Sequence, residues 1–99
     1  MIGSQCAAAR AMVQVSRPLL ASKTGVPEQV IYDFEHLITE PDEATIQTLK
    51  SKLEDLGAFF IPDDKFMGAG VRLKFNRSIT RRIATFENEG GPSHTDDVP

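Results

Sequence analysis

The chain has 99 residues, 40% of them hydrophobic and 25% charged, and its 11 basic and 14 acidic residues give a net charge of −3. This composition is typical of one small globular domain, and a negative total does not favour phosphate binding through overall charge. The lone Cys6 excludes an internal disulfide, and no apolar run approaches the roughly 18 residues that span a membrane. Residues 1–15 lack the basic start and continuous apolar stretch of a signal peptide, so we expect a cytoplasmic protein.

Two helices are expected near the start of the chain. The first covers about residues 5–13, where an Ala-rich segment has high helix propensity and Ser4 is the expected N-cap. The second covers residues 17–24, with Ser16 as its N-cap. It ends at Gly25, the residue type that most often closes a helix in a left-handed turn.

Two further helices are expected before residue 58. The third covers residues 28–37, and the fourth begins after its cap, Asp42, and ends at Gly57. The buried face of the third helix is expected to carry Val30, Ile31 and Phe34. The apolar stripe of the fourth helix consists of Ile46, Leu49, Leu53 and Leu56.

The pattern then changes from helical to alternating. Residues 58–62 are rich in β-forming side chains, and residues 70–76 alternate apolar and basic positions, so we expect a β-hairpin. The expected organisation is a helical domain over residues 1–57 and a hairpin extension over residues 58–77. Residues 78–99 carry few core-forming side chains, and we expect them to be a disordered tail.

The segment "LLASKTGVPEQVIYDFE" has the pattern of a helix-turn-helix, two short helices joined by a Gly-containing turn. With "AAAR" in the first helix, Ser16, "LA" at 20–21, "TGV" at 24–26 and "I..FE" at 31–35, the sequence resembles the λ-repressor-like (Cro/CI, XRE) family of helix-turn-helix regulators. Its ending, "LKSKLEDLGAFFIPDDKFMGAGVRLKF", resembles a bacterial subgroup with "GVEFI", a glycine-rich turn and "GVRL". The resemblance covers about residues 4–76. It implies a mainly α fold, a four-helix helix-turn-helix domain followed by a two-stranded β-hairpin.

The resemblance also implies roles for individual residues. Arg10 and Glu35 match a structural ion pair that joins the first helix to the end of the recognition helix. Arg17 matches a position whose side chain commonly contacts phosphate, and Lys23 is a second phosphate candidate. The residues expected to face DNA or a partner protein are Glu28, Gln29, Tyr32, Asp33, Leu37 and Ile38.

The sequence departs from the family pattern where DNA contacts would lie. Residues 1–45 contain three basic and six acidic residues, a local net charge of 3 − 6 = −3. The loop "HLITEP" carries Leu37 and Ile38 where the family usually has basic residues, and Glu40 adds repulsion. Tyr32 is expected to be exposed. Leu37 and Ile38 either join it in an apolar patch or lie in the core, and both alternatives stay open.

These observations favour a transcription regulator that binds another regulatory protein, as an antiactivator or antirepressor does. The alternative is a sequence-specific repressor or activator that binds a palindromic operator DNA as a dimer. A third hypothesis, a structural or toxin–antitoxin role through the hairpin and tail, has less support. The fold by itself does not decide between them.

The hairpin is rich in apolar side chains, and we expect some of them to form a homodimer or to dock the partner. The basic run over residues 72–82 is interpreted as a solvated strand face and tail. Cys6, His36 and His94 are far apart in the sequence and no CxxC or HxxxH occurs, so no metal site is expected. No motif for catalysis or for a cofactor was found, and we expect neither an enzyme nor a bound small-molecule cofactor.

Overall fold

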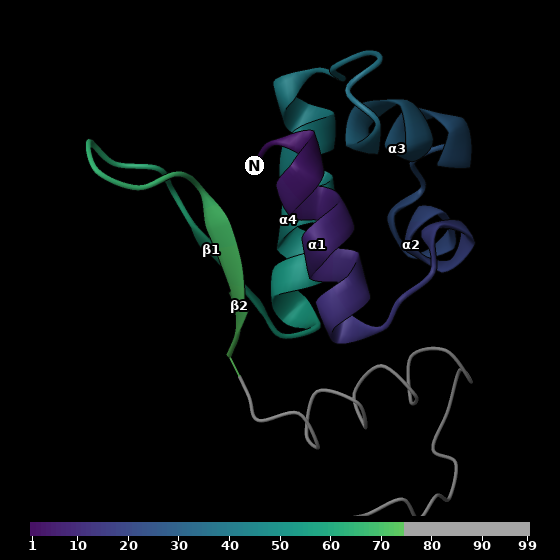
Figure 1. Ribbon diagram of the computed structural model, residues 1–99. Coiled ribbons are helices and arrows are strands. Elements are labelled where there is room, and N and C mark those ends of the chain that lie inside the picture. The colour runs from purple at the N-terminus through teal and green to yellow at the C-terminus, as the bar shows by residue number, and fades with distance from the viewer. Residues whose placement is uncertain (75–99) are drawn as a thin grey trace, which may run out of the picture.

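The computed structural model describes residues 1–74, which form four helices and one two-stranded antiparallel sheet. The helices are α1 (Gly3–Val13), α2 (Arg17–Thr24), α3 (Glu28–Glu35) and α4 (Glu43–Asp55), and the strands are β1 (Ala58–Ile61) and β2 (Gly70–Leu73). Figure 1 shows α1 and α4 side by side at the centre, with α2 and α3 on one side and the hairpin on the other. The last residues of the expected hairpin and the expected tail, residues 78–99, lie outside the described residues.

The start of α1 differs from the sequence prediction, because Ile2 and not Ser4 is its N-cap. The side-chain oxygen of Gln5 accepts a hydrogen bond from the backbone N–H of Ile2 at 3.0 Å. This contact closes the first turn ahead of Ser4, as the glutamine of a capping box does. Ser4 therefore lies inside the helix with its side chain exposed.

The other expected caps form. Ser16 Oγ accepts from the backbone N–H of Leu19 at 3.2 Å, and an Asp42 side-chain oxygen accepts from that of Thr45 at 2.9 Å. Hydrogen bonding by the Thr45 side chain and backbone N–H lowers the pKa of Asp42. Gly25 closes α2 at a φ of 81°, which a residue without a Cβ adopts at no steric cost.

The core lies between α1, α3 and α4, with one side chain from α2, and it contains the predicted apolar stripe of α4. The fully buried large side chains come from all four helices and from the residue after α4. They are Val13, Leu20, Ile31, Leu49, Leu53 and Leu56. Phe34 and Ile46 are also buried, and Val30 packs at the margin of the core.

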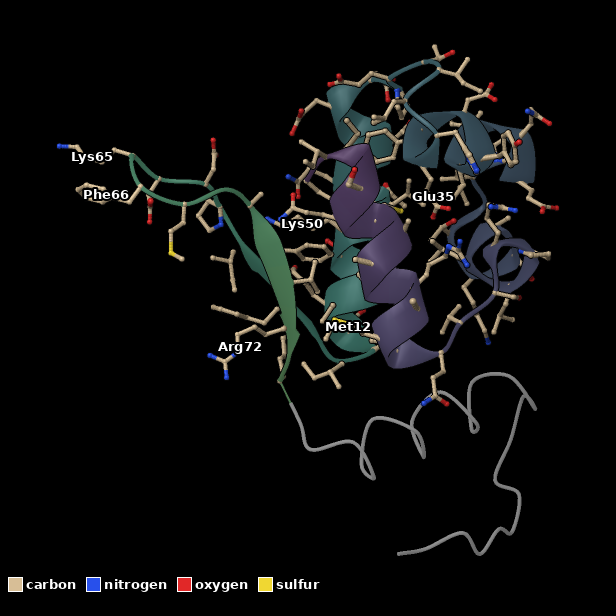
Figure 2. The ribbon with its side chains drawn as sticks, viewed as in Figure 1. Met12, Glu35, Lys50, Lys65, Phe66 and Arg72 are labelled. Carbon is tan, nitrogen blue, oxygen red and sulfur yellow. The ribbon has the colours of Figure 1, made fainter. Side chains whose placement is uncertain are left out.

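The first strand ends one residue earlier than predicted, and the predicted end of the second strand, residues 75–76, lies outside the described residues. The two faces of the hairpin differ. Ala58 pairs with Leu73 and Phe60 with Val71, and these side chains pack against the helical core. Phe59, opposite Arg72, is exposed. The far end of the hairpin, with Lys65 and Phe66, projects away from the helices (Figure 2).

A buried glutamine fastens the hairpin to α1. Gln5 is 7% exposed, and its side-chain amide nitrogen donates to the carbonyl oxygens of Ile61 at 3.2 Å and Gly70 at 2.9 Å. Its side-chain oxygen simultaneously caps the backbone of Ile2. One side chain therefore connects the first turn of α1 to both strands of the sheet.

Replacing Gln5 with Met should detach the hairpin, since two partly buried carbonyl groups lose their donor. We expect a loss of about 1–3 kcal/mol in the free energy of unfolding, measured by urea denaturation. Amide hydrogen exchange should accelerate more in β1 and β2 than in α4. Gln47→Met, at an exposed position on α4, is the matched control and should change neither quantity. Equal losses of protection in α4 and the strands would contradict the proposed role.

Candidate interaction surface

A buried carboxylate connects the first three helices. Glu35, at the end of α3, receives two hydrogen bonds from Arg10 of α1, from Nε to Oε2 at 2.7 Å and from Nη2 to Oε1 at 2.8 Å. Nη1 of Arg10 donates to the carbonyl oxygen of Val15, in the link between α1 and α2. The hydrogen bond with Glu35 raises the pKa of Arg10. The bidentate geometry makes this a strong, directional ion pair that fixes α3 against α1.

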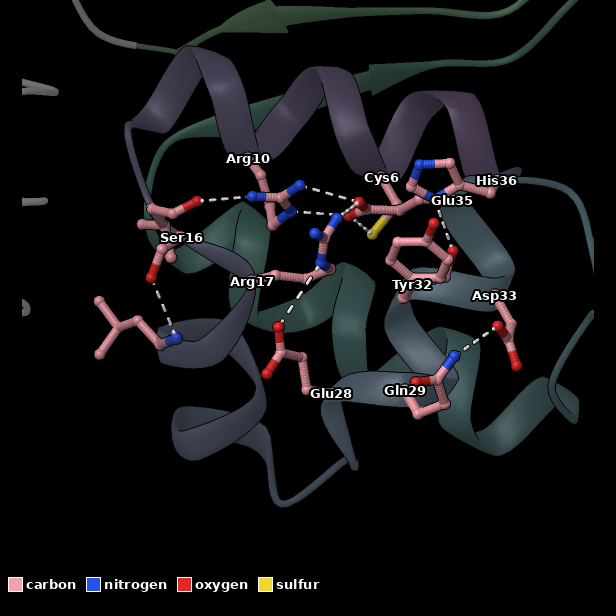
Figure 3. A network of polar contacts seen from close by, with 12 residues as sticks. Cys6, Arg10, Ser16, Arg17, Glu28, Gln29, Tyr32, Asp33, Glu35 and His36 are labelled. Atoms are coloured by element: carbon pink, nitrogen blue, oxygen red, sulfur yellow. Dashed lines mark hydrogen bonds and ion pairs between the residues drawn. The ribbon is translucent and has the colours of Figure 1, made fainter.

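Cys6 and Arg17 complete this group, which we call the Glu35 cluster (Cys6, Arg10, Arg17 and Glu35; Figure 3). The Cys6 thiol lies 3.4 Å from Oε2 of Glu35. Burial, together with the nearby Glu35 charge, raises the pKa of Cys6 to about 12. The thiol therefore stays protonated at neutral pH and is chemically inert in the folded state.

Arg17, the principal phosphate candidate, points along the protein surface toward acidic and aromatic groups. Its Nη1 lies 3.6 Å from Oε1 of Glu35, and its Nε lies 3.8 Å from Oε2 of Glu28. The guanidinium carbon sits 4.9 Å from the centre of the Tyr32 ring, a cation–π contact. Within the described residues, Nε is buried and has no hydrogen-bond partner. Three neighbours thus hold this cation against the protein.

The side chains on the outward face of α3 also contact one another. Tyr32 is 38% exposed and stacks on His36 with ring centres 4.0 Å apart. The side-chain amide nitrogen of Gln29 donates to a carboxylate oxygen of Asp33 at 2.9 Å. One of the two N–H donors of Gln29 that base recognition would use is therefore already engaged by an acidic neighbour.

The turn after α3 is the main correction to the sequence prediction. The helix ends at Glu35, two residues earlier than expected, and Leu37 adopts the left-handed conformation with a φ of 60°. The backbone N–H groups of Ile38 and Thr39 donate to the carbonyl oxygen of Asp33. This turn normally favours glycine, and a side chain there costs about 1–2 kcal/mol.

This turn also decides whether Leu37 and Ile38 are exposed or buried, which the sequence left open. Leu37 is 73% exposed and Ile38 is 64% exposed, so both lie outside the core. With Ile2, which is also exposed, they form an apolar patch that we call the Leu37 patch (Ile2, Leu37 and Ile38). A strained backbone that presents an exposed apolar side chain is more typical of a binding surface than of a stability element.

A groove of about 380 Å³ runs beside this patch, between the start of α1 and the segment that links α3 to α4. Phe34 also lines it, as does Glu40 on the linking segment. The helix ends come close here, since a Cβ at Gly3 would collide with the carbonyl oxygen of Phe34. The groove therefore depends on glycine at position 3 and on the Leu37 turn.

The sequence found several elements of this surface and missed others. It placed Arg10 beside Glu35, and it placed Glu28, Gln29 and Tyr32 on the exposed side of α3. The sequence also placed Asp33 there, but the structure shows Asp33 half-buried. The ion pairs of Arg17, the groove and the buried contacts of Gln5 and Cys6 were not foreseen. The spacing of Gln5, Ala9 and Val13 on one helix face was a usable signal for the burial of Gln5.

The described part of the chain holds no group of three or more His, Cys, Asp or Glu side chains that fits a metal ion. No helix within residues 1–74 is both long and apolar enough to cross a membrane.

No protein-family model matches the chain, and no curated protein matches it.

Replacing Arg10 with Met should destabilise the protein strongly, because it leaves the buried Glu35 carboxylate without its bidentate partner. We expect a loss of about 3–5 kcal/mol in the free energy of unfolding, reduced where Arg17 compensates. Lys50→Met removes a cation from the partly exposed pair with Glu54 on α4 and should cost at most about 1 kcal/mol. Urea denaturation measures both values. Similar losses for the two variants would show that the Glu35 cluster does not hold the helices together.

Proposed function

We propose that this protein is a transcription regulator of the λ-repressor-like helix-turn-helix type that acts by binding another regulatory protein. In this proposal α2 and α3 are the helix-turn-helix. The supporting geometry is two eight-residue helices joined across Gly25 in a left-handed turn, with Leu20, Val26 and Ile31 buried between them. The contact surface is the outward face of α3 with the Leu37 patch.

The state of Arg17 carries this proposal. A helix-turn-helix that binds DNA needs cations that are free to reach phosphate, usually several per protein. Here Arg17 is held by Glu28, Glu35 and Tyr32. A phosphate group approaching Arg17 would meet the half-exposed carboxylate of Glu28 at the start of α3. Lys23, the second phosphate candidate, is one further cation on α2.

The Leu37 patch supplies the affirmative argument for a protein partner. Exposed apolar side chains beside a polar rim are typical of protein interfaces. Leucine at a position that favours glycine weakens the fold, and contact with a partner would offset that cost. Sequence-specific DNA binding by a dimer remains the second candidate, and the experiment below separates the two.

DNA titration followed by backbone amide signals is the first test. With DNA from upstream of the protein's own gene, we expect no shifts at Arg17 or residues 28–33, in low salt of about 50 mM or in about 200 mM. Shifts at these positions that weaken steeply with salt would establish the DNA-binding alternative. Glu28→Gln removes the carboxylate that a phosphate group would meet, so it should make DNA-dependent shifts at Arg17 appear at about 50 mM salt and fade at about 200 mM. Asp63→Asn, on the hairpin, is the matched control and should not.

Cross-linking tests the same proposal by looking for the partner protein directly. A photoreactive amino acid replacing Ile38 in the full chain should cross-link in cells to a protein that mass spectrometry identifies as a transcription regulator. The same group at Asp63 should not. Cross-linking to DNA at position 38 would refute the proposed function.

We also propose that the hairpin contributes a homodimer contact. Phe59 lies on the outer face of the sheet, and Phe66 at the tip is 86% exposed. A two-stranded sheet has two unpaired edges, which a second copy can cover.

Sedimentation should show a dimer at high micromolar concentration. Phe59→Ser should shift the protein toward monomer, because it removes apolar area from the proposed contact. Tyr32→Ser replaces a less exposed aromatic residue on α3, 38% exposed against 53% for Phe59, and should leave the dimer intact. A strict monomer at these concentrations would eliminate the homodimer.

A further inference from the structure

We propose that the groove beside the Leu37 patch binds a basic amphipathic helix of the partner protein. This inference rests on the proposed function, and it names the kind of segment that the partner supplies. Three properties of the groove define that segment: its apolar wall, its backbone hydrogen bonds and the charge of its rim.

The apolar wall requires apolar side chains on the partner. Ile2 of the α1 start and Leu37 and Ile38 of the turn line the groove and are more than half exposed, and the mostly buried ring of Phe34 also lines it. A volume of about 380 Å³ lies at the lower end of the range for ligand pockets, which suits a few aliphatic side chains. Covering this wall would remove the exposed Leu37 patch from water.

Several backbone groups of the groove are already paired and offer no sheet edge to an extended partner. The N–H groups of Ile38 and Thr39 bond to Asp33, and that of Leu37 bonds to Phe34. On the opposite wall, the N–H of Ile2 donates to Gln5 and its carbonyl oxygen accepts from Cys6. A strand that docks by adding to a sheet edge needs unpaired backbone groups, whereas a helix satisfies its own. A helix with an apolar face is therefore the segment that fits.

The rim requires a positively charged partner. Between residues 24 and 49 the chain has no Lys or Arg. Glu40 lines the groove, and the exposed Asp42 and Glu43 follow it. The amino group of Met1 offsets the charge of Glu40 in the lining itself, so the local negative balance comes from Asp42 and Glu43 beside the groove. Lysine or arginine flanking the apolar face of the helix would complement this rim and favour its encounter with the groove.

The test uses designed peptides and the full-length protein. The probe is a peptide of about 16 residues, long enough to form a helix, with Leu at i, i+3, i+4 and i+7 spacing and Lys elsewhere. One control peptide replaces every Lys with Glu. A second keeps the composition but alternates Leu and Lys, the pattern of a strand. Binding is followed by amide chemical shifts and calorimetry.

We expect the basic helical peptide to shift the amide signals of Ile2, Leu37, Ile38 and Thr39. The acidic peptide and the alternating peptide should each bind at least about tenfold more weakly. Equal binding of either control, or shifts concentrated on the hairpin, would overturn the proposal.

Leu37→Gly is the decisive variant, because it removes the apolar side chain and relieves the left-handed strain. The protein should therefore stay folded, with equal or higher stability, and bind the basic helix at least about tenfold more weakly. Phe66→Ser, an exposed apolar residue on the hairpin tip, is the matched control and should bind normally. Equal binding by both variants would overturn the proposal.

The chain itself contains a segment of the same chemistry outside the described residues. In the sequence, Ile79, Ile83 and Phe86 recur there at i, i+4 and i+7. The basic residues among them are Arg77, Arg81 and Arg82. If Ile79→Ser with Ile83→Ser shifts the signals of Leu37 and Ile38 before any peptide is added, the chain's own tail occupies the groove, and a separate partner is excluded. Unchanged signals support the partner.

The two proposals fail differently. DNA binding through α3 with the peptide still held in the groove would refute the proposed function and retain the groove assignment. A cross-link from position 38 to a regulator, without preference for the basic helix, would retain the function and refute the assigned segment.

Discussion

The arrangement of the helices depends on the buried carboxylate of Glu35. A lone carboxylate would be costly to remove from water, and this one is compensated by a bidentate arginine from α1 and by the nearby guanidinium of Arg17 on α2. Because Arg10 also binds the carbonyl oxygen of Val15, the same ion pair fixes the path of the chain from α1 into α2. The orientation of α3, and hence of everything on its outward face, follows from this contact.

The same carboxylate changes what the surface can bind. It lies close to Arg17, and Glu28 and Tyr32 flank the rest of that side chain, so this cation is paired within the protein. On the other side of Glu35 the helix stops, and the left-handed turn presents Leu37 to solvent. The start of α3 thus carries an acidic side chain that pairs within the protein, whereas its end leads to exposed apolar side chains. This asymmetry favours a protein partner over a nucleic acid.

Much of the fold was predictable because local signals agreed with one another. Ser16, Gly25 and Asp42 mark helix ends by side-chain and backbone chemistry that acts within a few residues, and the α4 stripe follows from periodicity. The failures were of another kind. Gln5 defines the start of α1 and holds strands that lie more than fifty residues away in the chain, and Leu37 ends α3 in a conformation that its side chain disfavours. Spacing along α1 indicates that Gln5 is buried, but neither spacing nor local propensity reports which strands it binds or that Leu37 is left-handed. The groove was missed for the same reason, since its two walls, residues 1–4 and residues 34–40, are far apart in the chain.

The position of Cys6 beside Glu35 has a consequence for chemical ageing. A thiol that remains protonated reacts slowly with peroxides and electrophiles, so the folded protein resists oxidation at its one cysteine. Once the helices separate, the thiol regains an ordinary acidity and becomes open to sulfenic acid formation. Any such modification would place a polar group where the buried carboxylate needs its neighbours, and the helices would be hindered from closing again. Oxidative damage would then accumulate in molecules that had already opened, which makes the cysteine a chemical record of past unfolding.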